Sequence, residues 1–250
     1  MTPSLQALYV NPAPGCNLHC KHCWVNEGST VDNPLSLGCW KSLFEEAAEM
    51  GCGYIKFTGG EPLLHDNFVL LYEYAASLFS RLAVETNGTI EPEGLWTAFM
   101  NSLPESVSVS LDSCDPEAHD AFRGKKGAWL KTVAFLEKLA EKRIRHQIIM
   151  SITVPEKIPV EDMIKYAESH GHRNLKINLV TPSGRGKNLS FYGASGIADI
   201  IQFSNWLAAN SPEWVSIAIP AALLPVNRLK QVGYCPVKNL MGVLPDGRFS

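Results

Sequence analysis

The sequence predicts an α/β fold in which parallel strands are joined by crossover helices. Short apolar runs alternate with longer segments that carry apolar residues at helical spacing, and this rhythm repeats about six times. Polar or glycine-rich stretches follow almost every run. Six such units can form an open barrel, a closed barrel or a doubly wound sheet, and periodicity alone does not choose between them.

The individual elements follow from the chain in order. Apolar runs bounded by turn-forming residues predict strands at 8–12, 54–58, 81–86, 106–112, 147–154 and 175–180. The segments between them predict helices at 36–51, 67–80, 91–102, 128–143 and 160–171. The first of these helices opens on Ser36, a residue suited to an N-cap, and closes on glycine. Beyond residue 187 the rhythm loosens, and we expect a helix at 197–210, a strand at 214–219, and a loop with a hairpin turn at the sequence PDG.

Composition excludes several classes of protein. A chain of 250 residues that is 46% hydrophobic can bury the core of one large domain or two small ones. The formal net charge of -3 gives no sign of a polyanion-binding surface, so nucleic acid is not an expected partner. No signal-peptide pattern and no apolar run of about 18 residues occurs, so we expect no membrane association. Seven cysteines without an export signal indicate a reducing compartment, the cytoplasm, where thiols bind metals or do chemistry.

The stretch GCNLHCKHCW holds the most informative pattern in the chain. Cys16, Cys20 and Cys23 supply three thiols, whereas a structural zinc site needs four ligands. His19 or His22 is poorly placed as a fourth ligand, because each lies beside a cysteine in the chain. A four-iron cluster held by three thiolates would keep one iron open to a chelating substrate. The spacing favours the cluster, and zinc or unliganded thiols remain the alternatives.

The polar segments that follow the strands are expected to meet. The cysteine loop, GGEP, TNG, SLD and TPSGRG each stand at or just after the end of a predicted strand. In both parallel architectures the carboxyl ends of the strands line the reaction site. Five chemically suited segments are therefore predicted to converge on one rim.

These motifs resemble a known family. CNLHCKHC has the CxxxCxxC form of the radical S-adenosylmethionine (radical SAM) superfamily, and GGEP at 59–62 resembles that family's next signature. ETNGT, SVSLD, HDAFRG and TPSGRG look like the subgroup with auxiliary-cluster extensions, called SPASM or twitch. The resemblance implies an α/β partial (β/α)6 TIM-like barrel over 1–190. It also implies that 191–250 forms a C-terminal helix and strand and the start of a SPASM/twitch-like segment.

The resemblance implies a specific chemistry. Cys16, Cys20 and Cys23 would hold a [4Fe–4S] cluster, and the amino and carboxylate groups of S-adenosylmethionine would chelate the fourth iron. An electron, from a donor such as flavodoxin or ferredoxin, would cleave the sulfonium to a 5′-deoxyadenosyl radical that takes hydrogen from substrate. The favoured substrate is a peptide or protein side chain, and Arg185 is a candidate to bind an acidic part of it. A tetrapyrrole, haem-pathway or other cofactor-biosynthetic role is the alternative. A non-catalytic zinc module would leave GGEP and SLD unexplained.

Residues at the strand ends are expected to bind S-adenosylmethionine. Glycines at 59–60 would let the backbone approach the methionyl amino group, and Ser110 and Asp112 alternate with apolar neighbours, as ribose-binding groups at a strand end would. Arg123 is placed to reach the methionyl carboxylate, and His22 stands where the family often has an aromatic residue near adenine. The complete predicted set is His22, Gly59, Gly60, Glu61, Pro62, Thr86, Asn87, Ser110, Asp112, Arg123, Ser151 and Leu179. No catalytic side chain is identified.

The C-terminal segment contains one more candidate metal ligand. CPVKNLMGVLPDG resembles the start of a SPASM-type segment, in which further cysteines follow shortly. The chain stops at Ser250, before such a partner of Cys235 would fall. We therefore expect a truncated form, with auxiliary iron–sulfur clusters formed partly beyond residue 250. The alternative is that Cys235 is a lone buried thiol in a closing hairpin.

Overall fold

The protein is described by a computed structural model that covers residues 5–24, 33–189, 196–218 and 239–249. Its strands are β1 (Ala7–Val10), β2 (Tyr54–Phe57), β3 (Arg81–Thr86), β4 (Ser106–Ser110), β5 (His146–Ile152), β6 (Leu175–Leu179), β7 (Val215–Ala218) and β8 (Leu240–Val243). Its α-helices are α1 (Leu37–Glu49), α2 (Phe68–Leu78), α3 (Leu95–Asn101), α4 (Pro116–Arg123), α5 (Ala128–Glu141), α6 (Lys157–Ser169) and α7 (Ile197–Asn210). Two 3-10 helices, η1 (Pro62–Leu64) and η2 (Gly184–Asn188), follow β2 and β6.

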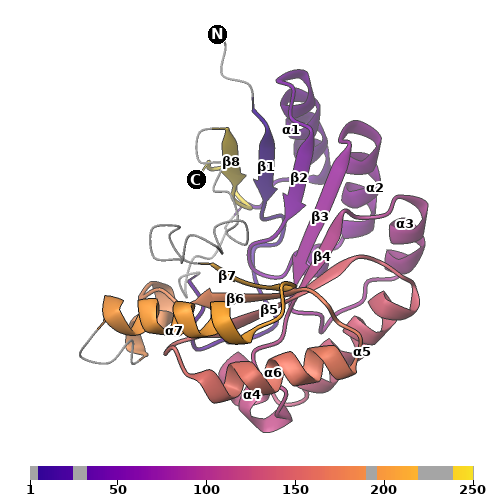
Figure 1. Ribbon diagram of the computed structural model, residues 1–250. Helices are drawn as coiled ribbons and strands as arrows, with labels where there is room; N and C mark the ends of the chain where they lie inside the picture. The colour runs from indigo at the N-terminus through magenta and orange to yellow at the C-terminus, as the bar shows by residue number, and fades with distance from the viewer. Residues whose placement is uncertain (1–4, 25–32, 190–195, 219–238, 250) are drawn as a thin grey trace.

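The strands form a single curved sheet with the order β7-β6-β5-β4-β3-β2-β1-β8 (Figure 1). Every neighbouring pair is parallel. Within the described ranges the edge strands β7 and β8 do not pair with each other, so hydrogen bonds do not close the barrel. The predicted α/β fold with a partial barrel is confirmed. Because all strands run in the same direction, their carboxyl ends lie on one rim.

The core lies between the sheet and the helices on its outer side (Figure 1). On β2, Ile55 and Phe57 are fully buried, and Phe57 packs edge-on against Phe44 of α1. Alternate residues face the other side of the sheet, where Lys56 of β2 forms an ion pair with Glu85 of β3. The barrel therefore has an apolar outer face and a partly charged interior.

Most predicted elements appear with small shifts of their ends. β3 and α7 have the predicted bounds, and Ser36 caps α1 by accepting a hydrogen bond from the Cys39 N–H at 3.2 Å. Helix α4, which begins after the N-cap Asp115 and ends within HDAFRG, was not predicted from the sequence. The predicted hairpin turn at PDG is confirmed, because the Gly247 N–H donates to the Leu244 carbonyl at 2.9 Å and Val243 forms an antiparallel bridge with Phe249. The residues before this turn form β8, which was not predicted and which pairs in parallel with β1.

The two ends of the sheet bear on the predicted domain division. β7 and β8 lie after residue 190 and extend the same sheet at its opposite edges, and the boundary at that residue stays a prediction. Cys235 falls outside the described residues, so its predicted role as a ligand of an auxiliary cluster also stays a prediction. Among the helices described, none is both long and apolar enough to span a bilayer.

Candidate cofactor site

The cysteine loop follows β1 and is held by backbone hydrogen bonds to distant segments. The N–H groups of His19 and Lys21 donate to the carbonyls of Arg123 and Phe122, at the end of α4. On the other side Arg185, at η2, donates from its backbone to the Cys23 carbonyl at 2.9 Å and from Nε to the Cys20 carbonyl at 2.8 Å. The Nε of Arg185 thus helps to hold the loop, and the predicted contact of Arg185 with substrate stays a prediction.

The three thiols of this loop differ in exposure. All are free, and Cys16 is exposed, Cys23 partly exposed and Cys20 buried. Although Cys16 as a residue is exposed, desolvation of its thiol group raises the pKa to about 11, and burial also raises the pKa of the Cys20 thiol. A metal centre would have to displace the thiol protons in order to bind here.

The glycine turn after β2 lies directly against the cysteine loop. The Glu61 N–H donates to the Gly15 carbonyl at 3.0 Å, and a Cβ atom at Gly60 would lie 2.2 Å from the same carbonyl oxygen. Gly59 has a φ of +106°, and a Cβ there would lie 1.9 Å from Asn11 Cγ. Only glycine permits this approach of two loops, which explains the GG pair in physical terms.

Glu61 lies behind this turn and ties it to the end of β3. Its side chain is fully buried, and Oε1 accepts from the Leu63 N–H and the Thr86 hydroxyl, while Oε2 accepts from the Asn87 N–H at 2.7 Å. Burial raises the pKa of the Glu61 carboxyl to about 7, although these hydrogen bonds favour the charged form. The carboxylate therefore organises two strand ends from behind.

A second buried carboxylate lies at the end of β4. Asp112 Oδ2 pairs with Arg123 Nε of α4 at 2.5 Å, and Oδ1 accepts from the Ser151 N–H at 2.9 Å. Burial by itself would raise the pKa of the Asp112 carboxyl, but the Arg123 guanidinium and the nearby histidines hold it below its usual range. His119 accepts from the Asp112 N–H through Nδ1 at 3.2 Å. Asp112 thus fixes the cation of α4 in place.

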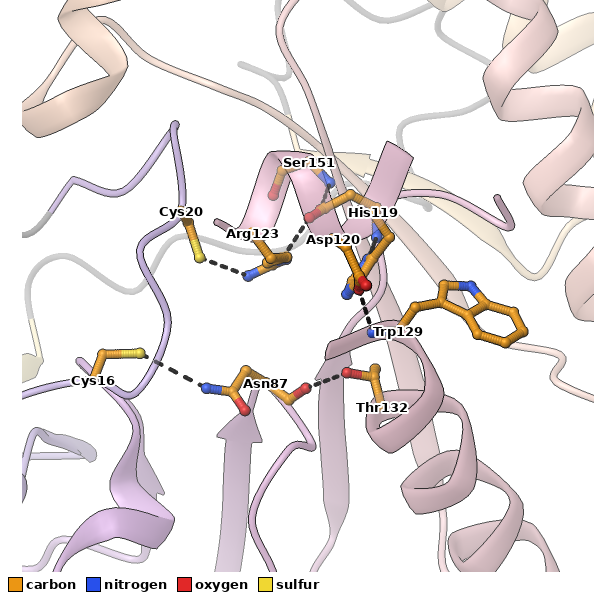
Figure 2. Close-up of polar contacts among 10 residues, drawn as sticks. Cys16, Cys20, Asn87, His119, Asp120, Arg123, Trp129, Thr132 and Ser151 are labelled. Atoms are coloured by element: carbon orange, nitrogen blue, oxygen red, sulfur yellow. Dashed lines mark hydrogen bonds and ion pairs between the residues drawn. The ribbon is translucent and has the colours of Figure 1, made fainter. Parts of the chain in front are cut away.

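Two N–H donors reach the cysteine sulfurs (Figure 2). Asn87 Nδ2 lies 3.7 Å from Cys16 Sγ, and Arg123 Nη1 lies 3.7 Å from Cys20 Sγ. Such donors are typical of sulfur ligands whose charge a protein stabilises. Both residues were predicted to contact S-adenosylmethionine, and their contacts with sulfur were not predicted from the sequence.

The rim encloses a cavity of about 730 Å³. Of the predicted site residues, those that line it are Cys16, Cys20, Cys23, His22, Gly59, Gly60, Thr86, Asn87, Ser110, Arg123 and Ser151. Glu61, Pro62, Asp112 and Leu179 do not line it. The carboxylates of Glu61 and Asp112 bond to the protein as described, so their direct contact with a cofactor stays a prediction.

His22 enters the cavity as a neutral aromatic group. Its ring stacks on Phe122, with ring centroids 4.4 Å apart, and burial lowers the pKa of the imidazole to about 4. Its Nδ1 is buried and has no hydrogen-bond partner among the described residues. A planar, uncharged ring at this position suits contact with a flat heterocycle.

Three further residues that line the cavity or support its wall were not predicted from the sequence. Asn17, beside the first cysteine, accepts from Asn87 Nδ2 at 2.9 Å, and Thr132 of α5 donates to the Asn87 carbonyl at 2.8 Å. Asn178 of β6 lines the cavity, and its buried Oδ1 has no partner within the described part of the chain. Alternation with Ile177 and Leu179 could have revealed Asn178, whereas no local pattern marks Thr132.

The donor set fits an iron–sulfur cluster better than a single ion. Three thiols line one cavity, which matches the ligand set of a four-iron cluster with one open iron, whereas a structural zinc site needs four ligands. The N–H donors near the sulfurs of Cys16 and Cys20 also favour a cluster.

Comparison with known proteins agrees with this geometry. Residues 10–170 match the radical SAM superfamily. The subtilosin biosynthesis protein AlbA of Bacillus subtilis is 29% identical over 175 residues, which cover 70% of this chain and 39% of AlbA. The AdoMet-dependent heme synthase of Oleidesulfovibrio alaskensis is 30% identical over 190 residues, which cover 75% of this chain and 49% of the synthase. The chain thus spans about half the length of the curated relatives it matches.

A solved structure shares the fold. Streptococcus suis SuiB bound to S-adenosylmethionine aligns with a TM-score of 0.75 and 13% identity, covering 98% of this chain and 58% of SuiB. Radical SAM proteins use a [4Fe–4S] cluster and S-adenosylmethionine, and the cavity residues of this chain fit both groups. The family match covers more than half of the sequence and includes the cysteine loop, the GG turn and the ends of β3 and β4. This chain belongs to the radical SAM superfamily.

Proposed function

We propose that the protein is a radical SAM enzyme that modifies a peptide or protein side chain. The observation that carries this proposal is the grouping of Cys16, Cys20 and Cys23 on the wall of one cavity that strand ends also line. These thiols would hold a [4Fe–4S] cluster with one iron free for S-adenosylmethionine. Bound together, the two groups supply a 5′-deoxyadenosyl radical that abstracts hydrogen from substrate.

The residues of this chain would bind and orient S-adenosylmethionine and keep water out of the cavity. The hydroxyls of Ser110 and Ser151 line the cavity and are available to ribose, and Arg123 presents a guanidinium there that Asp112 holds in place. His22 offers a neutral ring for adenine. The GG turn packs directly against the cysteine loop and lines the cavity, so its backbone would lie next to the methionyl group.

Peptide maturation is favoured over the alternatives by the range of relatives. AlbA is named for biosynthesis of the bacteriocin subtilosin, MftC of Mycolicibacterium smegmatis is named as a maturase, and SuiB has been solved bound to the precursor peptide SuiA. The heme synthases match with similar identity, so tetrapyrrole chemistry remains the second candidate. We propose in addition a cytoplasmic setting and a flavodoxin or ferredoxin as electron donor.

The test starts with the protein reconstituted with iron and sulfide without oxygen. We expect about four iron and four sulfide per chain. We also expect an electron paramagnetic resonance (EPR) signal of the reduced protein that changes when S-adenosylmethionine is added, and release of 5′-deoxyadenosine. Cys16→Ala, Cys20→Ala and Cys23→Ala together should remove all three. Cys39→Ala, on the exposed face of α1, is the matched control and should retain them. A signal that ignores S-adenosylmethionine would refute the proposal.

The substrate class is tested separately. Incubation with precursor peptides encoded near the gene, compared with iron-containing tetrapyrroles, distinguishes the two candidates through the mass change of the product. Modification of a peptide supports maturation, and conversion of the tetrapyrrole alone would replace it with the second candidate.

A further inference from the structure

Asn87 is unusual among the cavity residues because each of its polar atoms is bonded. Its backbone N–H donates to Glu61 Oε2 at 2.7 Å, and its carbonyl accepts from the Thr132 hydroxyl at 2.8 Å. Its side-chain Oδ1 accepts from both the N–H and the hydroxyl of Thr89, at 2.8 and 2.6 Å. Only 6% of the residue is exposed. The side chain is therefore held in one position.

The hydrogen bonds also fix which end of the amide faces the cysteine loop. A backbone N–H can only donate, so the Asn87 atom that faces the Thr89 N–H is the oxygen. The other end of the amide is the NH2 group, which faces Asn17 Oδ1 at 2.9 Å and Cys16 Sγ at 3.7 Å. The Thr89 N–H therefore dictates that the amide turns its NH2 group toward the sulfur, and Figure 2 shows that group facing Cys16.

Three side chains close this arrangement into a ring. Asn17 Nδ2 donates to Thr89 Oγ1 at 2.7 Å, Thr89 Oγ1 donates to Asn87 Oδ1, and Asn87 Nδ2 donates to Asn17 Oδ1. In such a ring each bond strengthens the next. One N–H of Asn87 is left over from the ring, and Cys16 Sγ is its acceptor.

We propose that Asn87 donates this hydrogen bond to the Cys16 thiolate of the cluster-bound protein and thereby raises the cluster's reduction potential. The inference rests on the proposed cluster. A donor to a ligand sulfur stabilises the reduced state more, because that state places more negative charge on sulfur, and hydrogen bonds to sulfur are known determinants of cluster potentials. Asn87 is thus a tuning residue for the metal centre, distinct from its predicted contact with S-adenosylmethionine.

Asn87 isolates this effect better than Arg123 does. Arg123 Nη1 also reaches a sulfur, that of Cys20, but its charge is paired with Asp112 inside the protein. Removing Arg123 would change the charge near the cluster and leave a buried carboxylate without its partner. Asn87 is neutral, so its removal changes no charge near the cluster, although it also removes the acceptor for Thr89 and the donor to Asn17.

The experiment is a redox titration of the reconstituted protein, followed by the EPR signal of the reduced cluster. Asn87→Ala should lower the ratio of reduced to oxidised cluster about tenfold at a fixed solution potential, which for a one-electron couple is about 59 mV. Iron and sulfide content is measured on the same samples. If the alanine variant binds less iron, Asn87→Asp replaces it as the test variant, because aspartate preserves the side-chain volume and the oxygen that accepts from Thr89. It should lower the potential at least as far.

Two further variants separate tuning from general damage. Thr89→Val removes the hydroxyl from the ring but leaves the donor on Asn87, so a smaller decrease is expected. Asn174→Ala removes an asparagine that Gln147 contacts at 2.7 Å, at the opposite end of the barrel strands, and should leave the potential unchanged.

The outcomes distinguish this inference from the function it rests on. A wild-type protein without iron and sulfide would overturn the proposed function. An intact cluster in Asn87→Ala with the wild-type potential, or a potential in Asn87→Asp at or above the wild-type value, would overturn only the role of Asn87. An equal decrease in Asn174→Ala would also overturn it, because the effect would then not depend on the contact with Cys16.

Discussion

The wall of the cavity is supported from behind by two buried carboxylates, Glu61 and Asp112, in contrasting surroundings. Among the residues that the structure describes, the donors to the Glu61 carboxyl are neutral groups of Leu63, Thr86 and Asn87. Asp112 receives the Arg123 cation. Burial penalises both charges, yet the pKa of Glu61 is raised to about 7 and that of Asp112 is lowered. In this protein, neutral hydrogen bonds do not outweigh burial, whereas a cation supported by further groups does.

The difference divides the rim into two halves with different sensitivities. The half built on β2 and β3 is held by a carboxylate that can be protonated near neutral pH, and it carries Asn87 toward Cys16. The half built on β4 and α4 is held by a permanent ion pair and carries Arg123 toward Cys20. The stability that the first half contributes should depend on pH, and the stability that the second half contributes should depend on the charge of Arg123.

The largest expected effect comes from breaking the ion pair. Arg123→Met preserves much of the apolar stem but leaves Asp112 buried without a cation, which costs about 3–5 kcal/mol in the free energy of unfolding. Urea denaturation at pH 7 measures the change, with the slope of the transition checked for constancy.

The matched control removes both charges. In the double variant Asp112→Asn with Arg123→Met, the asparagine can still accept from the Ser151 N–H. It should be less destabilised than Arg123→Met alone, because no unpaired charge remains. Equal or greater destabilisation of the double variant would contradict the role assigned to the charge pair.

The pH dependence of stability tests the other half. The folded-state pKa of Glu61, about 7, lies above the ordinary glutamate value of 4.5. Folding favours the protonated form of the Glu61 carboxyl. Its contribution to the free energy of unfolding is therefore fully present below about pH 4.5 and is lost as the pH rises through 7. Wild type should lose stability relative to Glu61→Gln across this window, by at most about 1.4 kcal/mol per pH unit. Parallel stability profiles of the two proteins, measured by urea denaturation, would exclude a raised pKa.

Much of this architecture was accessible from the sequence. Strand positions follow from apolar runs and turn residues, and a parallel arrangement of these strands predicts that the cysteine loop, the GG turn and Asn87 share one rim. Gly60 shows why such motifs are informative. A side chain there would collide with the Gly15 carbonyl, so the local sequence records a tertiary contact.

The orientation of side chains on the rim was not accessible in the same way. Glu61 and Asp112 stand at strand ends, but whether a carboxylate faces the cavity or lies behind it depends on partners such as Thr86 and Arg123 in other elements. β8 was missed for a similar reason. Its four residues carry no signal for pairing with β1, which lies at the other end of the chain.

A smaller effect is expected from removing one neutral donor to Glu61. Thr86→Val deletes the hydroxyl that lies 2.7 Å from Oε1. The expected cost is about 1.5–3 kcal/mol at pH 8, where the acceptor is charged, and about 1 kcal/mol below pH 5, where it is neutral. Denaturation at the two pH values measures both. Thr132→Val removes a hydroxyl from the neutral Asn87 carbonyl and should cost the same at both, so a similar pH dependence there would exclude Glu61 as the cause.

The smallest effect should come from an ion pair of ordinary chemistry in an exposed setting. Lys138 Nζ contacts the Glu91 carboxylate at 2.7 Å, a distance close to that of the buried pair, but the two side chains are 46% and 31% exposed. Water already stabilises both charges, so Lys138→Met should cost about 0.5 kcal/mol. That cost should shrink in 1 M salt, where the screening length falls to about 3 Å. Loss of Arg123 should be nearly insensitive to salt. If both variants lost the same stability with the same salt dependence, then burial would not be what distinguishes the two pairs, and the contrast between the halves of the rim would need another cause.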